Sequence, residues 1–157
     1  MCKLDKKVLL FVGIISNQDL EDIGNIYHLI SYPERENISI KEQLINLQTA
    51  LKSKEKVAII TNSPYIVEYI NISITLGSGI AYLQHGEIIR GSERYVPIYK
   101  EDISIYELYN DTYKEYKTDD YGAIIFLFRE VKEQLHDDNQ SISEYLFYKQ
   151  NPRLNYN

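Results

Sequence analysis

Three apolar runs of strand length most constrain the fold of this 157-residue chain. They occupy residues 7–15, 26–31 and 56–61, and apolar side chains fill them almost without interruption. A strand with one solvent-exposed face alternates apolar and polar residues, whereas a strand covered on both faces is apolar throughout. The runs therefore predict an α/β fold with a small parallel-core sheet flanked by helices. The first run is too short to span a bilayer, and we expect no membrane segment.

A helix is predicted between the second and third runs. Ser39 and Glu42 form a capping-box pattern, in which each side chain satisfies a free backbone amide at the start of a helix. Apolar residues then recur at spacings of four, three and four, namely Ile40, Leu44, Leu47 and Leu51. This spacing is typical of a helix that packs one face against a sheet. Strand, helix and strand together predict a right-handed crossover between parallel strands.

A second helix is predicted after the third run. Asn62 and Ser63 can cap its start, and Pro64 suits the first helical position because its amide is not needed there. The helix is expected to extend to about residue 76. Gly77 and Gly79 are predicted to end it, since glycine commonly follows the last helical residue.

The rest of the chain is predicted to contain a β-hairpin and a helical C-terminal part. Residues 80–85 and 87–90 have strand character, with Gly86 in the turn. A further helix is expected over residues 120–135. Its apolar face consists of Ile124, Phe128, Val131 and Leu135. Residues 137–157 are predicted to fray into a flexible tail.

The overall composition is that of one soluble globular domain spanning residues 1–157, with 44% hydrophobic and 25% charged residues. The net charge of −6 argues against direct nucleic-acid binding, because phosphates require a concentrated basic face. The only cysteine, Cys2, leaves no disulfide within the chain, and we expect a cytoplasmic protein.

Two further features suit partner binding but also have simpler explanations. The fifteen tyrosines can form an interaction surface, or they can reflect a nucleotide bias that also enriches Ile, Asn and Lys. Acidic pairs at residues 119–120 and 137–138 flank the predicted C-terminal helix. The first pair complements the helix dipole, whereas both pairs together would also suit a basic groove on another protein.

A motif follows the third apolar run, where residues 57–67 read VAIITNSPYIV. This segment resembles the switch-histidine segment of OLD/RecF-like and related ABC-type ATPases, in which an apolar strand precedes Thr-His-Ser-Pro-Tyr. The matching residues are Thr61, Ser63, Pro64 and Tyr65. Asn62 stands where the family has histidine.

The second apolar run leads into a segment similar to the Walker B strand of the same family. There, an apolar strand is followed by Asp-Glu-Pro-Glu. Pro33 and Glu34 match the last two residues of this pattern, whereas Ser31 and Tyr32 replace the two carboxylates. A second interpretation of Glu34 is an ordinary acidic side chain on the surface, in a charged stretch of the sequence.

The resemblance covers residues 20–135 and has clear gaps. Gln43 corresponds to the glutamine that opens a helix in the family, and residues 80–88 resemble the strand, turn and strand that follow the switch segment. No stretch matches the phosphate-binding loop Gly-x-x-x-x-Gly-Lys-Ser/Thr. Residues 17–24 are polar and acidic in place of the Leu-Ser-Gly-Gly-type signature.

These replacements imply a truncated P-loop ATPase-like domain without catalysis. Hydrolysis in this class needs one carboxylate to hold Mg²⁺, a second group to orient water and a polar residue to sense the γ-phosphate. Serine, tyrosine and asparagine do not supply those charges, so we expect no cofactor and no bound metal.

The resemblance therefore implies a non-catalytic protein-interaction module. Its expected partner is an ATPase or nuclease subunit, which it would mimic or dock onto, for example as an inhibitor encoded by a phage or mobile element. The alternative is an accessory subunit that completes a nucleotide site in trans with Asn62 or Glu34. Homo-oligomerisation also remains open.

Other site chemistries lack support in the sequence. His28, His85 and His136 have no second ligand three or four residues away, so they predict no zinc site. Ser63 lacks the Gly-x-Ser-x-Gly setting of a hydrolase nucleophile, and helix capping accounts for it.

Overall fold

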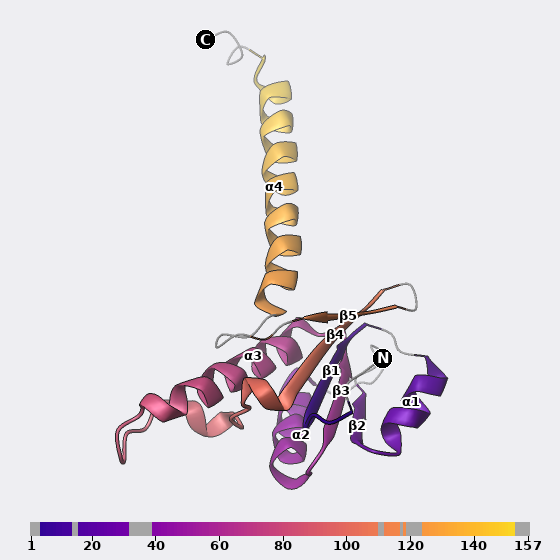
Figure 1. The fold of residues 1–157 in the computed structure, drawn as a ribbon. Coiled ribbons are helices and arrows are strands. Elements are labelled where there is room, and N and C mark those ends of the chain that lie inside the picture. Colours follow the sequence, from indigo (N-terminus) through magenta and orange to yellow (C-terminus); the bar gives the residue numbers. More distant parts are fainter. Residues whose placement is uncertain are drawn as a thin grey trace. The chain divides into compact units, whose positions relative to one another are not determined.

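The computed structural model describes residues 4–13, 16–31, 39–109, 112–116, 118 and 124–152 (Figure 1). The chain divides into two compact units, Met1–Ile124 and Ile125–Asn157.

The first unit contains a five-stranded sheet in the order β2-β3-β1-β4-β5. Its strands are β1 (Val8–Val12), β2 (His28–Ser31), β3 (Val57–Thr61), β4 (Ile103–Tyr109) and β5 (Thr112–Tyr116). The first four are mutually parallel, and β5 pairs with β4 in the antiparallel sense. The α/β fold and all three predicted strands are confirmed. Each strand begins and ends within its apolar run.

The central strands are apolar throughout because both of their faces are covered. Side chains alternate between the faces of a strand. On one face, Leu9 and Phe11 pack with Tyr106 of β4 and Ile23 of helix α1 (Asn17–Gly24). The sequence did not predict α1, since few of its residues are apolar.

Helices α2 (Ile40–Ser53) and α3 (Pro64–Gly79) lie on the other face of the sheet (Figure 1). Leu10 and Ile59 point to this side, and both are fully buried. The first unit therefore has three layers, with α1 on one face of the sheet and α2 and α3 on the other.

Helix α2 begins where the capping pattern predicts. The Ser39 hydroxyl accepts a hydrogen bond from the Glu42 amide at 3.2 Å. The predicted apolar stripe is only partly buried, because Ile40 at the first helical position is 43% exposed. Burial is concentrated on Leu47 and Ala50, in the central and later turns of the helix.

Helix α3 extends to Gly79, beyond the predicted end near residue 76. Gly77 does not end the helix. A Cβ added at this position would overlap the backbone carbonyl of Ile98. Glycine at 77 thus allows the loop before β4 to approach the helix closely, which the local sequence does not reveal.

The hairpin predicted over residues 80–90 is wrong. This segment contains a 3-10 helix, Ile80–Tyr82, and then irregular backbone with Gly86 in a turn. Its large apolar side chains are exposed, with Tyr82 at 87% and Ile88 at 83%. A hairpin needs an apolar face packed against other elements, and this segment has none. The hairpin of the fold is β4–β5 instead.

The second unit is dominated by one helix, α4 (Ile124–Gln150), of 27 residues. The predicted helix ended near residue 135, so this boundary is wrong, and residues 137–150 are helical. All described side chains of residues 133–152 are exposed. No helix in the described ranges has both the length and the apolar character needed to cross a bilayer.

Candidate functional site

The carboxyl ends of the parallel strands bring several predicted residues to one edge of the sheet. Ser31 of β2 pairs in register with Ile60, and Val12 of β1 pairs with Thr61, so the three strands end almost level. Gly13 follows β1 with a φ of 131°, and its amide donates to the Thr61 carbonyl at 3.2 Å. A Cβ at Gly13 would lie only 2.9 Å from the Leu108 Cβ, so this edge is closely packed.

The switch-like segment lies at this edge, where β3 passes into α3. Thr61 is buried, and its hydroxyl accepts a hydrogen bond from the Ser63 amide at 2.9 Å. Thr61 therefore shapes the turn, and its hydroxyl points back to the chain. Asn62, which the sequence comparison placed at the position of a histidine in the ATPase pattern, is exposed.

Ser63 occupies the N-cap position of α3 as predicted, but its side chain makes no capping hydrogen bond. Pro64 is the first helical residue, again as predicted. Tyr65 follows and is 60% exposed. The segment thus presents one neutral polar and one aromatic side chain to solvent.

The Walker B-like residues are only partly observed. Ser31, at a carboxylate position of the family pattern, is the exposed last residue of β2. Tyr32, Pro33 and Glu34 lie outside the described residues. Gln43 is half-buried one turn into α2, whose start also lies at the carboxyl edge of the sheet.

A carboxylate that the sequence did not single out also lies at this edge. Asp19 of α1 accepts hydrogen bonds from the Ser16 hydroxyl at 2.7 Å and the Tyr113 hydroxyl at 2.6 Å. The hydrogen bonds from Tyr113 and Ser16 hold the pKa of Asp19 below its ordinary value of 3.8. Tyr113 also packs against Phe11 and Tyr106, so its ring belongs to the core.

A second tyrosine of β5 binds a second carboxylate, because the Tyr116 hydroxyl donates to Glu107 of β4. Tyr113 and Tyr116 are three residues apart on one strand and so point to opposite faces of the sheet. Asp19 and Glu107 are consequently held on different faces. Paired carboxylates for acid–base work or Mg²⁺ binding must converge on one point, and these two do not.

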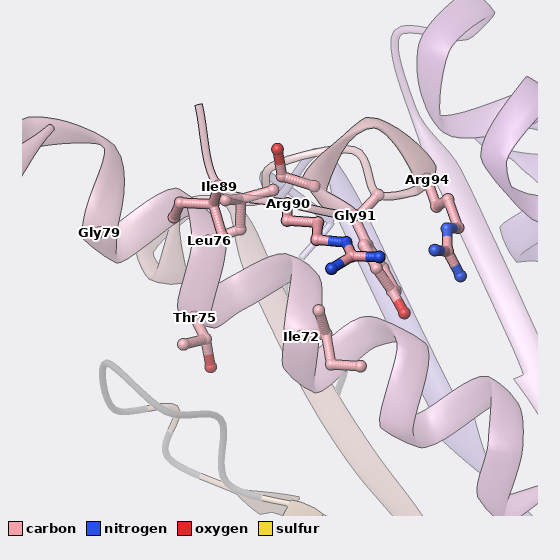
Figure 2. Close-up of a pocket in the computed structure, with 10 residues that line it drawn as sticks. Ile72, Thr75, Leu76, Gly79, Ile89, Arg90, Gly91 and Arg94 are labelled. Carbon is pink, nitrogen blue, oxygen red and sulfur yellow. The ribbon is translucent and has the colours of Figure 1, made fainter. Parts of the chain in front are cut away.

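A cleft of about 530 Å³ lies at the other end of α3, between the helix and residues 89–95 (Figure 2). Figure 2 shows Leu76 of the helix beside Ile89, with Arg90 and Arg94 extending from the same loop. The loop is held on the helix by the Tyr69 hydroxyl, which donates to the Arg94 carbonyl at 2.9 Å. Burial raises the pKa of Tyr69.

The lining of this cleft suits an apolar group that carries a negative charge. Ile72 and Leu76 form apolar walls, and the guanidinium groups of Arg90 and Arg94 are available at the rim. In the part of the chain that the structure describes, neither arginine takes part in an ion pair. The sequence did not indicate this cleft, because it depends on how the loop packs against α3.

The three histidines lie on separate elements of the described structure. His28 is on β2, His85 is in the turn before Gly86, and His136 is on α4, and all three are exposed. Among residues 4–13, 16–31, 39–109, 112–116, 118 and 124–152, no group of three His, Cys, Asp or Glu side chains is arranged to hold a metal ion.

Comparisons of the chain with known protein families, with curated proteins and with solved structures gave no significant match. The geometry of the chain itself is therefore the basis for its proposed function.

Proposed function

We propose that this chain is a non-catalytic protein-interaction module on an ATPase-like scaffold. It docks onto an ATPase or nuclease subunit through the carboxyl edge of its sheet. The observation that carries the proposal is the chemistry of this edge, where the switch-like segment exposes Asn62 and Tyr65. Tyrosine is enriched at protein interfaces, where charged groups are depleted.

The fixed carboxylates support a binding role over a catalytic one. Asp19 and Glu107 each accept a hydrogen bond from a tyrosine hydroxyl, and they lie on opposite faces of the sheet. Both therefore stabilise the edge as a scaffold. Thr61 has a similar role, because its hydroxyl holds the turn that positions Asn62.

Site-specific photocrosslinking tests the docking edge. Benzoylphenylalanine would replace Tyr65 and, in a matched control, Tyr99, which is 51% exposed before β4 at the amino edge of the sheet. Both probes would be expressed in the organism that encodes the chain, and the adducts identified by mass spectrometry. We expect an ATPase or nuclease subunit to be captured about tenfold more often from position 65.

Two outcomes would contradict the proposal. Identical adducts from both positions would show that the carboxyl edge is not the contact surface. Release of phosphate from ATP by the purified chain, at an enzymatic rate, would show that the module is catalytic. Adding the captured subunit back to the chain and measuring its activity then distinguishes inhibition from assistance.

A second function, completing a nucleotide site in trans, is favoured by the start of α3. The Ser63 side chain accepts no hydrogen bond from the first backbone amides of this 16-residue helix. Such helix starts bind phosphate, and the exposed Asn62 lies beside them. Titration calorimetry with ATP and Mg²⁺, using the captured subunit with and without the chain, tests this function. Unchanged affinity, or the same affinity with Asn62→Ala, excludes it.

A further inference from the structure

The cleft beside the later turns of α3 has a positive lining on an acidic protein. Its volume of about 530 Å³ is typical of small-molecule sites, and every residue that lines it belongs to the first unit. Arg90 and Arg94 are among these residues, and none of the described lining residues is acidic. The chain as a whole has a net charge of −6. The cleft therefore differs from most of the molecule in the charge that it would attract.

The loop that carries both arginines is held in place from two helices. The Tyr69 hydroxyl of α3 donates to the Arg94 carbonyl at 2.9 Å. The Gln48 carboxamide of α2 donates to the Glu93 carbonyl at 3.1 Å. The ring of Tyr95 also packs against that of Tyr69, with a centroid distance of 5.0 Å. A loop fixed before a ligand arrives loses less conformational entropy on binding, so these contacts favour a ligand site.

A turn at Gly91 brings the two arginines to the same cleft. Gly91 has a φ of 85°, in the left-handed region that glycine adopts without strain. A Cβ at Gly91 would lie 3.7 Å from Nη2 of Arg94, so this guanidinium group folds back toward the residue that follows Arg90. Figure 2 shows Gly91 between the two side chains. As far as the structure describes the chain, both guanidinium groups lack a carboxylate partner and are available to an anion.

The helix side of the cleft is aliphatic. Ile72 and Leu76 come from successive turns of α3, and Ile89 of the loop lies beside Leu76 (Figure 2). The helix extends for about 10 Å between Ile72 and Gly79, the first and last of its residues that line the cleft. An aliphatic group placed along this stretch would lose contact with water, which favours its binding.

We propose that this cleft binds a small aliphatic molecule that carries a phosphate monoester. The hydrocarbon part packs against Ile72, Leu76 and Ile89, and the two arginines bind the phosphate. A phosphate monoester has a charge of about −1.5 to −2 at pH 7, which matches two guanidinium groups, whereas a carboxylate has a single charge. The docking edge lies at the start of α3 and the cleft at its later turns, so this inference does not depend on the proposed function.

Titration calorimetry of the full chain with octyl phosphate, below its micelle-forming concentration, tests the site. We expect one molecule to bind per chain, with an affinity that falls as salt is added. Octanol and inorganic phosphate should each bind at least about tenfold more weakly, because each lacks one half of the contacts. Octanoate has one charge, so its affinity should lie between those of octanol and octyl phosphate.

Paired substitutions locate the binding. Arg90→Gln and Arg94→Gln should each weaken the binding of octyl phosphate about tenfold. Lys52→Gln removes an exposed cation of α2 outside the cleft and should leave the affinity unchanged. Leu76→Glu places an acid within the cleft and should abolish detectable binding. Its control is Ile26→Glu, at a 45% exposed position in the turn after α1. Far-ultraviolet circular dichroism verifies that all of these variants keep their fold.

Three results would overturn the proposal. The first is a chain that does not bind octyl phosphate. The second is an affinity for octanol or octanoate equal to that for octyl phosphate, which would show that the arginines do not select a doubly charged head. The third is equal weakening by Arg94→Gln and Lys52→Gln, which would show that the ligand responds to overall charge and not to the cleft.

Sedimentation with vesicles that contain phosphatidic acid distinguishes a soluble ligand from a membrane lipid. The cleft contacts the hydrocarbon part as well as the phosphate, and in a vesicle the hydrocarbon is buried in the bilayer. We therefore expect the chain to remain in the supernatant. Cosedimentation with these vesicles that Arg94→Gln abolishes would refute the assignment to a soluble molecule.

Discussion

The sheet of the first unit and helix α4 of the second differ in how they accommodate apolar side chains. Leu9, Leu10 and Phe11 of β1 are fully buried, whereas Leu135 and Ile142 of α4 are at least 60% exposed. The sheet is covered by helices of its own unit, so its stability is intramolecular. Within its own unit, helix α4 has no such cover along its described side chains, residues 133–150.

Truncating one apolar side chain in the sheet and one in α4 tests this contrast. Phe11 stacks on Tyr106 with a ring-centroid distance of 5.4 Å, and Phe11→Ala leaves a cavity in the core. We expect a loss of about 4 kcal/mol in the free energy of unfolding, measured with urea. Leu135→Ala should change the free energy of unfolding by less than about 0.5 kcal/mol, because Leu135 is 64% exposed. Similar losses for the two variants would mean that α4 packs into the same core.

Two glycines of α3 differ in how closely other parts of the first unit approach them. Gly77→Ala places a Cβ against the Ile98 carbonyl, and we expect it to destabilise the chain by about 3 kcal/mol. A Cβ at Gly79 meets no atom within 4 Å, so Gly79→Ala should stabilise by up to about 1 kcal/mol. Thermal unfolding of both variants gives the comparison. Equal midpoints would contradict the close approach of the loop to α3.

The starts of α2 and α3 predict a smaller difference. Ser39→Ala removes the acceptor for the Glu42 amide, with an expected loss of about 1 kcal/mol. Ser63 makes no side-chain cap, so Ser63→Ala should have an effect below about 0.5 kcal/mol. Chemical denaturation measures both. A larger loss at Ser63 would show that its hydroxyl does cap α3.

The smallest effect concerns pH and the link between Tyr113 and Asp19. The pKa of Asp19 is lowered in the folded chain, chiefly by the Tyr113 hydroxyl and then by Ser16. Its contribution to stability is therefore complete above the ordinary pKa of 3.8 and is lost as the pH falls through the lower folded pKa. Tyr113→Phe should raise the pKa of Asp19, as followed by carboxyl-carbon NMR.

The unfolding free energies of wild type and Tyr113→Phe should also converge in acid. The difference contributed by this hydrogen bond is present near neutral pH and disappears once Asp19 is protonated in both proteins. Ser16→Ala is the matched control, with a smaller shift in the same direction. A difference that stays constant with pH would assign the effect to packing of the Tyr113 ring.

Several elements could be predicted because their conformation depends on residues close to them in the chain. The apolar runs predicted β1, β2 and β3, because burial on both faces requires apolar residues throughout a strand. The Ser39 cap and Pro64 predicted the starts of α2 and α3, because each acts within one helical turn. The segment from Thr61 to Tyr65 was likewise correctly expected at the end of a strand.

Contacts between residues far apart in the sequence became visible only in the folded chain. Tyr113 reaches Asp19 across 94 residues, and Gly77 is required by the backbone of Ile98. The hairpin predicted over residues 80–90 was wrong for the same reason, since strand character forms a strand only where a neighbouring edge and a packed face are available. Local pattern sets the conformation of a segment where nearby residues suffice, as at helix caps, whereas packing between segments determines which residues form the site.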